Sequence, residues 1–530
     1  MATIEDFTKW AANNGIKAPH VYIDKTDNAG YGLFGDKDID INDTTPLVHI
    51  PRDLLITSIR ALHDNQELHN AVKSIFKISS RNNNNDNNKN DDDDDDKRLN
   101  ETVLEPRNER LLLRLFLALQ KFSDKQTSES FWKPYINILP SLDEVRQQHV
   151  LFLVGEDEDD TYEGNEVGLD GTNLSRSIHA KRSVLMRELT MIKDTVEWMT
   201  LDMWIWADIV FWSRVVSIGS SDGDGGNDSN NGDLALIPFF DFANHSLQPN
   251  ISWCPANDGG INFVPNSSSV SLAGNELLIS YGDKSNQELL FLHGFTLEDN
   301  PEPSRITMAL TGFLDMSMMD SQVKLSWITQ SSKPVLTLTV PSATGDYRDK
   351  KVVDTTISDI ITLTTGWTKE SIALMYLVAL DQDDGLKFEL VPDISRLSIS
   401  DSSQEKEENM ENENMIIQAR LLDEVVEDLN DLAFKVMKLD HSAVIQLRVV
   451  MLLLDALEYH LHLITSSSSN DENVSTDTAG VMIHVERYKQ DELELIQKSI
   501  NGLKKLRDWL MTHESVVEFL AAQEEQEDEA

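Results

Sequence analysis

Two short stretches hold most of the side chains that could do chemistry. The first, IPFFDFANHSLQPN at 237–250, places Asp241, Asn244 and His245 directly after an apolar run. An acid, an amide and an imidazole cost several kcal/mol to bury without partners, so a ligand or another part of the chain must satisfy them. A metal ion is not expected here, because no second histidine or cysteine stands at a useful spacing.

The second stretch is ELLISYGDKSNQELLFLHGF at 276–295. It predicts a strand over 276–281, a turn at Gly282-Asp283 and a helix that ends at Gly294. Tyr281 stands at the end of the expected strand, where a phenol can point into a site. A lone tyrosine in such a place is more often a core residue whose hydroxyl has found a partner.

A third motif, GYGLFG at 30–35, matches the GxGxxG pattern of dinucleotide-binding proteins. That function requires a preceding strand and an amphipathic helix that opens on the last glycine. Polar alternation and a second strand follow instead, so the glycines indicate a tight turn or a close approach of backbone to a ligand. The sequence has no P-loop or HExxH motif, which excludes the kinase and metalloprotease classes built on them.

The elements that must position these residues change in type along the chain. A first helix is expected from the Thr3/Asp6 capping box to Gly15, with Phe7 among its inward residues. Residues 16–60 alternate apolar stretches with turns, as strands do; 108–215 have helical periodicity, and strand patterns return over 234–283. Helices dominate after about 285, notably over 415–465 and 488–523.

Charge and composition narrow the class of protein. The net charge of −45 argues against a nucleic-acid-binding surface and suits cationic partners. Much of the acidity lies in polar runs such as NNNNDNNKNDDDDDD at 82–96, which predict insertions without a packed core.

The expected environment is intracellular. The single cysteine, Cys254, rules out an intramolecular disulfide and a cysteine-built zinc site, and it fits a reducing compartment. We expect no signal peptide, transit peptide or membrane-spanning segment. The cytoplasm is the expected location, with the nucleus as an alternative.

Taken in order, the motifs GYGLF, Ser213-Arg214, DFANHS and ELLISYG…HGF resemble those of the SET-domain protein methyltransferases. The subgroup they resemble is that of the Rubisco large-subunit and actin-histidine methyltransferases. Flanking segments are similar too, among them IPRDLLIT at 50–57 and FWKPYINILP at 131–140. The resemblance covers nearly the whole chain apart from the Asn/Asp-rich insertions.

The fold class implied by this resemblance is α+β. It consists of a β-rich SET domain over 1–300, with a pseudoknot and a helical insert at about 105–215, and a mostly α-helical substrate-binding domain of the Rubisco-methyltransferase type over 301–523. Disordered insertions are expected at about 80–100 and 218–233, and an acidic tail at 524–530.

The resemblance also implies S-adenosylmethionine as the cofactor, and no metal. The expected cofactor contacts are Ala29, Gly30, Tyr31, Arg214, Asn244, His245 and Phe295. In this family the segment corresponding to Asn244-His245 is threaded beneath the strand ending in the YG motif, which would explain why these groups are buried. Relatives often have Glu where this chain has Ala29, so one polar cofactor contact is expected to be missing.

The implied reaction is methyl transfer to a protein side chain by a monomeric enzyme. Tyr281 is the expected catalytic residue, orienting the attacking nitrogen, with Phe240 and Asp241 on the substrate side. A lysine target is favoured, because no amide stands near Arg214 to hold a histidine ring in one tautomer. Protein-histidine methylation and a non-catalytic SET-fold adaptor are the alternatives.

Overall fold

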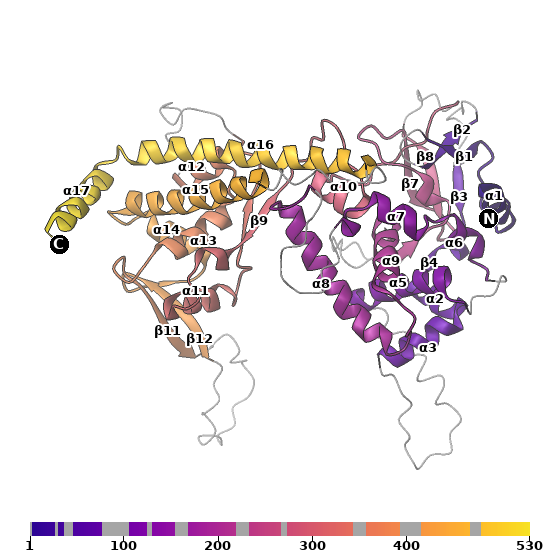
Figure 1. Ribbon diagram of the computed structural model, residues 1–530, viewed down its shortest axis with the longest axis horizontal. Helices are drawn as coiled ribbons and strands as arrows, with labels where there is room; N and C mark the ends of the chain where they lie inside the picture. The colour runs from indigo at the N-terminus through magenta and orange to yellow at the C-terminus, as the bar shows by residue number, and fades with distance from the viewer. Residues whose placement is uncertain are drawn as a thin grey trace, which may run out of the picture.

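The computed structural model describes residues 3–26, 30–36, 46–76, 105–124, 130–153, 168–218, 233–266, 273–342, 357–392, 415–466 and 479–529. They form two lobes, and the long helix α16 (Ala479–Leu510) crosses from one to the other. Figure 1 shows the N-terminal elements in one lobe and α11 to α15 in the other. Ala29, all of 80–100, and residues 219–232 lie outside the described residues.

The expected N-terminal helix is confirmed as α1 (Ile4–Asn13). Thr3 and Asp6 make both hydrogen bonds of the capping box, and Phe7 is fully buried. Gly15 follows the helix with a φ of 95°, a conformation that glycine adopts without a steric penalty.

The first lobe is built on three small antiparallel sheets rather than one large one. Short strands separated by turn residues predict such small sheets. Their strand orders are β1 (Val21–Lys25)-β2 (Tyr31–Gly35), β3 (Val48–Ile50)-β8 (Ile261–Pro265)-β7 (Ile251–Pro255), and β4 (Ile56–Thr57)-β6 (Asp233–Leu236)-β5 (Val216–Ile218). The strand expected over 276–281 is wrong as a regular element, because these residues make isolated bridges to two different partners.

The first lobe also contains many helices. They are α2 (Ser58–Asp64), α3 (Gln66–Ile75), α5 (Pro106–Phe122), α6 (Lys133–Ile138), α7 (Leu142–Gln148), α8 (Asn173–Lys193), α9 (Leu201–Arg214) and α10 (Asn286–His293), with 3-10 turns η1 (Arg52–Leu54), η2 (Val150–Phe152) and η3 (Phe240–Phe242).

A buried ionic network joins α5, α8 and α9, three of the helices that lie between β4 and β5 in the sequence. Arg114 of α5 donates to Glu188 of α8 at 2.8 and 2.9 Å and to Asp208 of α9 at 2.8 Å. Lys181 of α8 reaches the second oxygen of Asp208 at 2.9 Å. Each buried charge thus has a partner of opposite sign, as burial requires.

The second lobe is mostly helical, as expected, but it also contains two small sheets. Its elements are β9 (Ile306–Ala309), η4 (Leu310–Phe313), α11 (Met319–Ile328), β10 (Val335–Leu338), α12 (Ile357–Thr365), α13 (Lys369–Ala379), β11 (Leu386–Pro392), β12 (Met415–Leu421), β13 (Glu424–Val426), α14 (Leu429–Val436), α15 (Ser442–Ser466), α16 and α17 (Glu514–Glu529). The helix expected from 415 is therefore wrong over its first part, which forms β12 and β13. The acidic end expected to be a tail continues α17 as far as Glu529.

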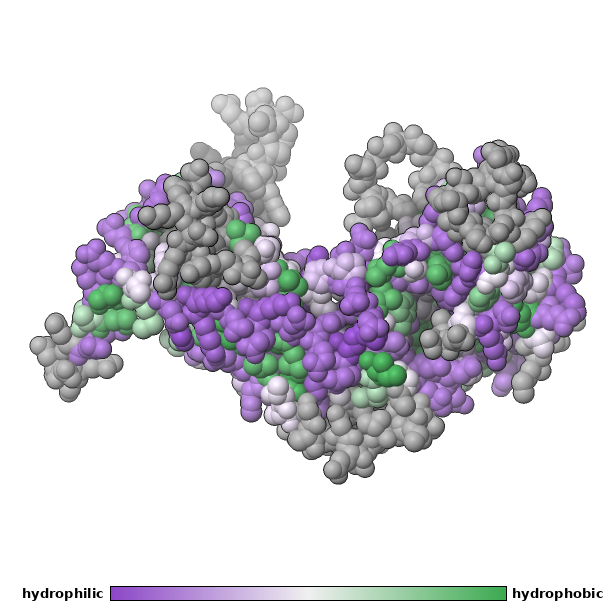
Figure 2. Space-filling view, turned by 90° about the horizontal axis from the view of Figure 1, so that it is seen from above, coloured by the Kyte–Doolittle hydropathy of each residue, from purple (hydrophilic) through white to green (hydrophobic). Residues whose placement is uncertain are grey.

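Two apolar cores correspond to the two lobes, and α16 contributes to both. Val481, Val485 and Tyr488 lie in the core of the first lobe, whereas Ile496 and Leu503 lie in the core of the second. Most outward residues of α16 are hydrophilic, with Ile483, 62% exposed, as an exception, and Figure 2 shows a largely hydrophilic surface over the middle of the molecule. Within the described ranges, no helix is both long enough and apolar enough to cross a membrane.

A candidate active site at the crossing of two segments

The two chemically rich stretches meet in space. His245 pairs with Ile279 in a parallel bridge, in which Ile279 N donates to Asn244 O at 2.9 Å and Ser246 N donates to Ile279 O at 2.9 Å. On its other side the 276–281 segment contacts β2, where Leu277 N donates to Leu33 O at 2.7 Å. The segment ending at Tyr281 therefore lies between β2 and the Asn244–Ser246 segment.

The turn that leads into this crossing has an unusual backbone. Phe239 has a φ of 77° and a ψ of −37°, values that a bulky side chain adopts at a cost of about 1–3 kcal/mol. Its ring is 3% exposed and stacks on Phe7 at 6.5 Å between centroids, so packing holds the turn in place. This turn leads into η3, which places Asp241 and the carbonyl group of Ala243 at the crossing.

Asn244 and His245 are half-buried and each has partners. Asn244 Nδ2 donates to Glu276 Oε1 at 2.7 Å and to Tyr31 O at 3.2 Å. A side chain in place of Gly32 would collide with the Glu276 carboxylate, which explains the second glycine of GYG. His245 Nδ1 accepts from Tyr281 N at 3.0 Å, and burial lowers the pKa of this imidazole. The side chains of Asn244 and His245 are thus satisfied mainly by the second stretch.

Tyr281 lies at the centre of the crossing. Its hydroxyl donates to Ala243 O at 3.1 Å, and burial raises its pKa to about 12. The phenol therefore stays protonated near neutral pH and acts as a donor whose oxygen can also accept. It cannot serve as a general base, because that role requires a pKa closer to the working pH.

Two histidine rings lie beside Tyr281, and a phenylalanine ring lies near both histidines. The ring centroid of Tyr281 is 5.1 Å from that of His245 and 4.9 Å from that of His293, and the Phe295 ring lies 6.2 and 6.1 Å from these two histidines. Tyr281, His245 and Phe295, predicted from separate motifs, are thus brought together. His293 was not singled out from the sequence, although it lies in the HGF motif next to Phe295.

His293 is an uncharged group in this cluster. Burial is the main cause that lowers its pKa to about 4, and the nearby charge of Lys284 adds to this effect. A neutral imidazole at this place can accept or donate one hydrogen bond without repelling a cation.

Arg214 and Asp241 form one ion pair instead of facing separate ligands. Arg214 Nε lies 3.3 Å from Asp241 Oδ2, and the same oxygen accepts from the Tyr135 hydroxyl at 3.0 Å. The Asp241 side chain is 6% exposed, and burial raises its pKa against the opposing effect of Arg214. Its other oxygen, Oδ1, has no hydrogen-bond partner among the described residues.

The remaining predicted positions lie at the edges of the site or in the core. Phe240 is 5% exposed and packs edge-on against Trp253 at 5.8 Å and against Phe263 at 5.1 Å, so its direct environment is the core around β7 and β8. Gly30 has a φ of 77°, and a Cβ added there would meet no atom within 4 Å. Tyr135 was missed as a partner of Asp241, because nothing in the sequence connects residues 106 positions apart.

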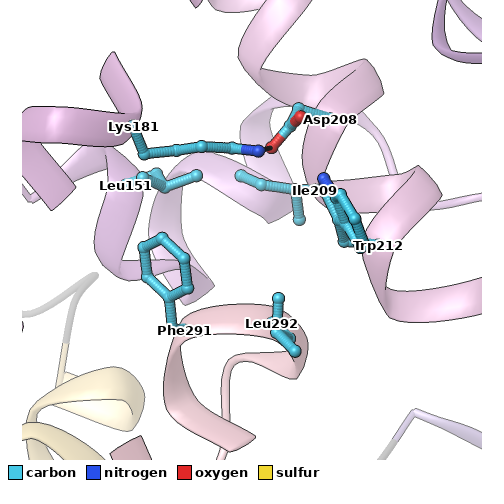
Figure 3. A pocket seen from close by; sticks show the side chains of 7 residues that line it. All are labelled: Leu151, Lys181, Asp208, Ile209, Trp212, Phe291 and Leu292. Atoms are coloured by element: carbon cyan, nitrogen blue, oxygen red, sulfur yellow. Dashed lines mark ion pairs between the residues drawn. The ribbon is translucent and has the colours of Figure 1, made fainter. Parts of the chain in front are cut away.

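A small cavity lies beyond α10, among α8, α9 and η2. Figure 3 shows Lys181 extended toward Asp208 above it and Phe291 and Leu292 of α10 below. Its volume is about 10 Å³, roughly the space of one water molecule. That is too small for a cofactor or a side chain, so we assign it to packing.

Comparisons with known proteins agree with this arrangement. No family model matches the chain. The ribosomal lysine N-methyltransferase set10 of Schizosaccharomyces pombe is 28% identical over 211 residues, which are 39% of this chain and 34% of that protein. The protein-lysine N-methyltransferase EFM1 of Saccharomyces cerevisiae is 22% identical over 346 residues, which are 59% of this chain and 53% of that protein. The match thus covers about a third of the length of set10 and about half of that of EFM1.

The similarity to solved structures extends over almost the whole chain. The SET domain of LSMT bound to lysine and AdoHcy superposes with a TM-score of 0.57 and 15% identity, covering 96% of this chain and 92% of that one. Rubisco LSMT bound to AdoMet gives a TM-score of 0.56 and 16% identity with the same coverage. At such identities the similarity establishes the fold.

Proposed function

From the SET-domain fold of this chain, we propose that it is an S-adenosylmethionine-dependent protein-lysine N-methyltransferase. The observation that carries the proposal is the Tyr281 hydroxyl, held on the Ala243 carbonyl within the crossing of the two segments. The names of the relatives, all of them lysine methyltransferases, support lysine over histidine as the target.

The donor set suits a zwitterionic cofactor. A guanidinium suits a carboxylate, and the Arg214 side chain remains 23% exposed beside its contact with Asp241. Open space next to Gly30 lets backbone approach a ligand. The residues proposed to hold the cofactor are Gly30, Tyr31, Arg214, Asn244, His245 and Phe295, with Ala29 proposed on sequence grounds.

The protein's main task would be to present a neutral lysine amine. The methyl group comes from the sulfonium of S-adenosylmethionine, and a protonated amine has no lone pair to attack it. At pH 7 a free lysine of pKa ~10.4 needs roughly 4–5 kcal/mol to lose its proton. Burial lowers this cost by disfavouring the charged form.

The side chains of the cluster fit that task. Because the Tyr281 hydroxyl donates its hydrogen bond to Ala243 O, the lone pairs of its oxygen can accept a hydrogen bond from the target amine and orient it. Neutral His293 adds no repulsive charge, and Asp241 compensates the charge of Arg214. Alignment and desolvation of this kind account for most catalysis of in-line transfers.

We further propose a monomeric enzyme that acts on proteins in the cytoplasm. Its net charge of −45 favours cationic protein targets, and a chain with one cysteine fits a reducing compartment. Phe240 and Asp241 remain proposed substrate-side residues; both are buried, so they would act through the shape and charge of the pocket wall.

A transfer assay with labelled S-adenosylmethionine tests the proposal. The purified chain is incubated with lysate, the product is hydrolysed in acid, and the amino acids are separated. We expect labelled Nε-methyllysine. Labelled methylhistidine in place of methyllysine would show that the target is histidine. A chain that neither binds the cofactor in isothermal titration nor transfers label would be an adaptor.

A further inference from the structure

The first half of α16, although it comes from the end of the chain, contacts the loop that follows α10. Thr296 in that loop is 5% exposed. Its backbone N–H and its hydroxyl lie 3.1 and 3.0 Å from His484 Nδ1, and Arg487 Nη1 donates to its hydroxyl oxygen at 3.1 Å. Because Nδ1 accepts from a backbone N–H, His484 is neutral here; burial, and secondarily Arg487, lowers its pKa.

One helical turn further along, α16 makes a second contact with the same region. Asn286 Nδ2 donates to Asp491 Oδ2 at 2.7 Å and to Leu297 O at 3.0 Å. Asn286 Oδ1 in turn accepts from Leu297 N at 2.9 Å. Asn286 is 3% exposed, so water does not replace these bonds easily.

Phe295 stands immediately before the residues held in this way. Gly294 ends α10 in the left-handed conformation with a φ of 82° and turns the chain toward the histidine cluster. Thr296 and Leu297 are then fixed from α16 and from the start of α10. The backbone that follows Phe295 is thus held in place, and the Phe295 ring lies near the rings of His245 and His293.

We propose that His484, together with Arg487, is a positioning residue for cofactor binding. From α16 it holds Thr296 and so sets the position of the Phe295 ring, one of the proposed cofactor contacts. The inference rests on the proposed function, because it takes Phe295 as a cofactor contact. It makes affinity for the cofactor depend on a helix whose other half lies in the core of the second lobe.

The test uses three variants of the full chain. His484→Ala removes the acceptor, whereas His484→Asn keeps an amide oxygen close to the place of Nδ1. Gln490→Ala, on the outward face of the same helix, is the matched control. We expect the Kd for S-adenosylmethionine to rise about five- to tenfold in His484→Ala, as for one lost buried hydrogen bond or slightly more. The Kd of the other two should stay within about twofold of the unmodified chain.

A split in the kinetics separates positioning from a general loss of structure. At saturating cofactor, His484→Ala should keep its kcat while its KM for the cofactor rises. Unchanged affinity in His484→Ala, or equal weakening in His484→Asn, would overturn the inference. If His484→Ala does not fold, Thr296→Val with Thr296→Ser as its control tests the same contact by the same titration. An unmodified chain that does not bind the cofactor would instead contradict the proposed function.

Discussion

Replacing Glu492 should destabilise the junction between the lobes more than any exposed change on α16. The carboxylate is 1% exposed and accepts from Asn173 N, the first residue of α8, at 2.8 and 3.1 Å. It also accepts from the Tyr488 hydroxyl and from His460 Nε2, the latter at 2.9 Å. His460 Nδ1 in turn accepts from Arg176 Nη2 at 3.0 Å, so one carboxylate joins α8, α15 and α16.

The magnitude follows from the donors that Glu492→Ala leaves unpaired. Each unpaired buried donor costs about 1–3 kcal/mol, and removal of one partner from a buried charged network typically costs about 3–5 kcal/mol in total. We therefore expect a loss of about 4 kcal/mol. At an unfolding entropy of about 2.1 cal/mol/K per residue, the melting temperature of a 530-residue chain changes by about 1 °C per kcal/mol, so it should fall by about 4 °C.

The assay is thermal unfolding of Glu492→Ala, Glu492→Gln and Glu494→Ala. Glu492→Gln keeps the size and one acceptor oxygen, so its loss should be intermediate. Glu494 lies two residues further along, on the exposed face of the helix. Its side chain is 66% exposed and pairs with Lys498, and such surface pairs contribute less than about 1 kcal/mol. If Glu492→Ala melted within about 2 °C of Glu494→Ala, the junction would not depend on this carboxylate, and the reasoning would be wrong.

Three further outcomes are expected around the site. Tyr281→Phe should lower turnover by about 10²–10⁴-fold while the cofactor Kd stays within a few-fold, because the phenol acts on the nucleophile; a collapse of cofactor binding would make Tyr281 structural. Asn244→Ala should weaken cofactor binding and lower the melting temperature together, since it removes the bonds to Tyr31 O and Glu276; unchanged values of both would contradict its place in the crossing. Burial lowers the pKa of His149 to about 3, against ~6.5 when unfolded. The stability that comes from burying this neutral imidazole should therefore be fully present above about pH 6.5 and be lost as the pH drops toward 3. His149→Asn, which keeps an acceptor for Leu151 N, should lessen that loss in urea titrations at several pH values.

Local signals in the sequence predicted local structure well. The capping box of Thr3 and Asp6 and the stop at Gly15 depend on residues within a few positions of each other, and α1 has the expected ends. The fold class and the SET-domain fold followed from motifs whose order along the chain is itself informative.

Errors arose where the structure depends on distant partners. Residues 276–281 have a strand-like pattern, but their hydrogen bonds go to β2 on one side and to Asn244–Ser246 on the other, so no regular ladder forms. The β12–β13 hairpin was taken for helix because its turn, Leu422-Asp423, lacks the usual Asn-Gly signal. Both residues nevertheless have positive φ values of 49° and 69°, as two-residue hairpin turns require.

The site shows the same division. Tyr281, His245 and Phe295 came from motifs and lie together, whereas the pairing of Arg214 with Asp241 and the bond from Tyr135 could not be read from the sequence. Residue types indicate which groups need partners, but the identity of those partners is decided by contacts between elements far apart along the chain.

Core membership in this molecule does not follow the order of the sequence. A boundary near residue 300 remains our proposal for the domains, yet Val481, Val485 and Tyr488 complete the core of the first lobe. Gly171, just before α8, fits so closely against Leu463 of α15 that a Cβ would come within 2.8 Å of its backbone. The first lobe thus depends on residues that follow most of the second lobe in the chain. Because α16 belongs to both cores, the second lobe is part of the frame that supports the site, and its role in substrate binding remains our proposal.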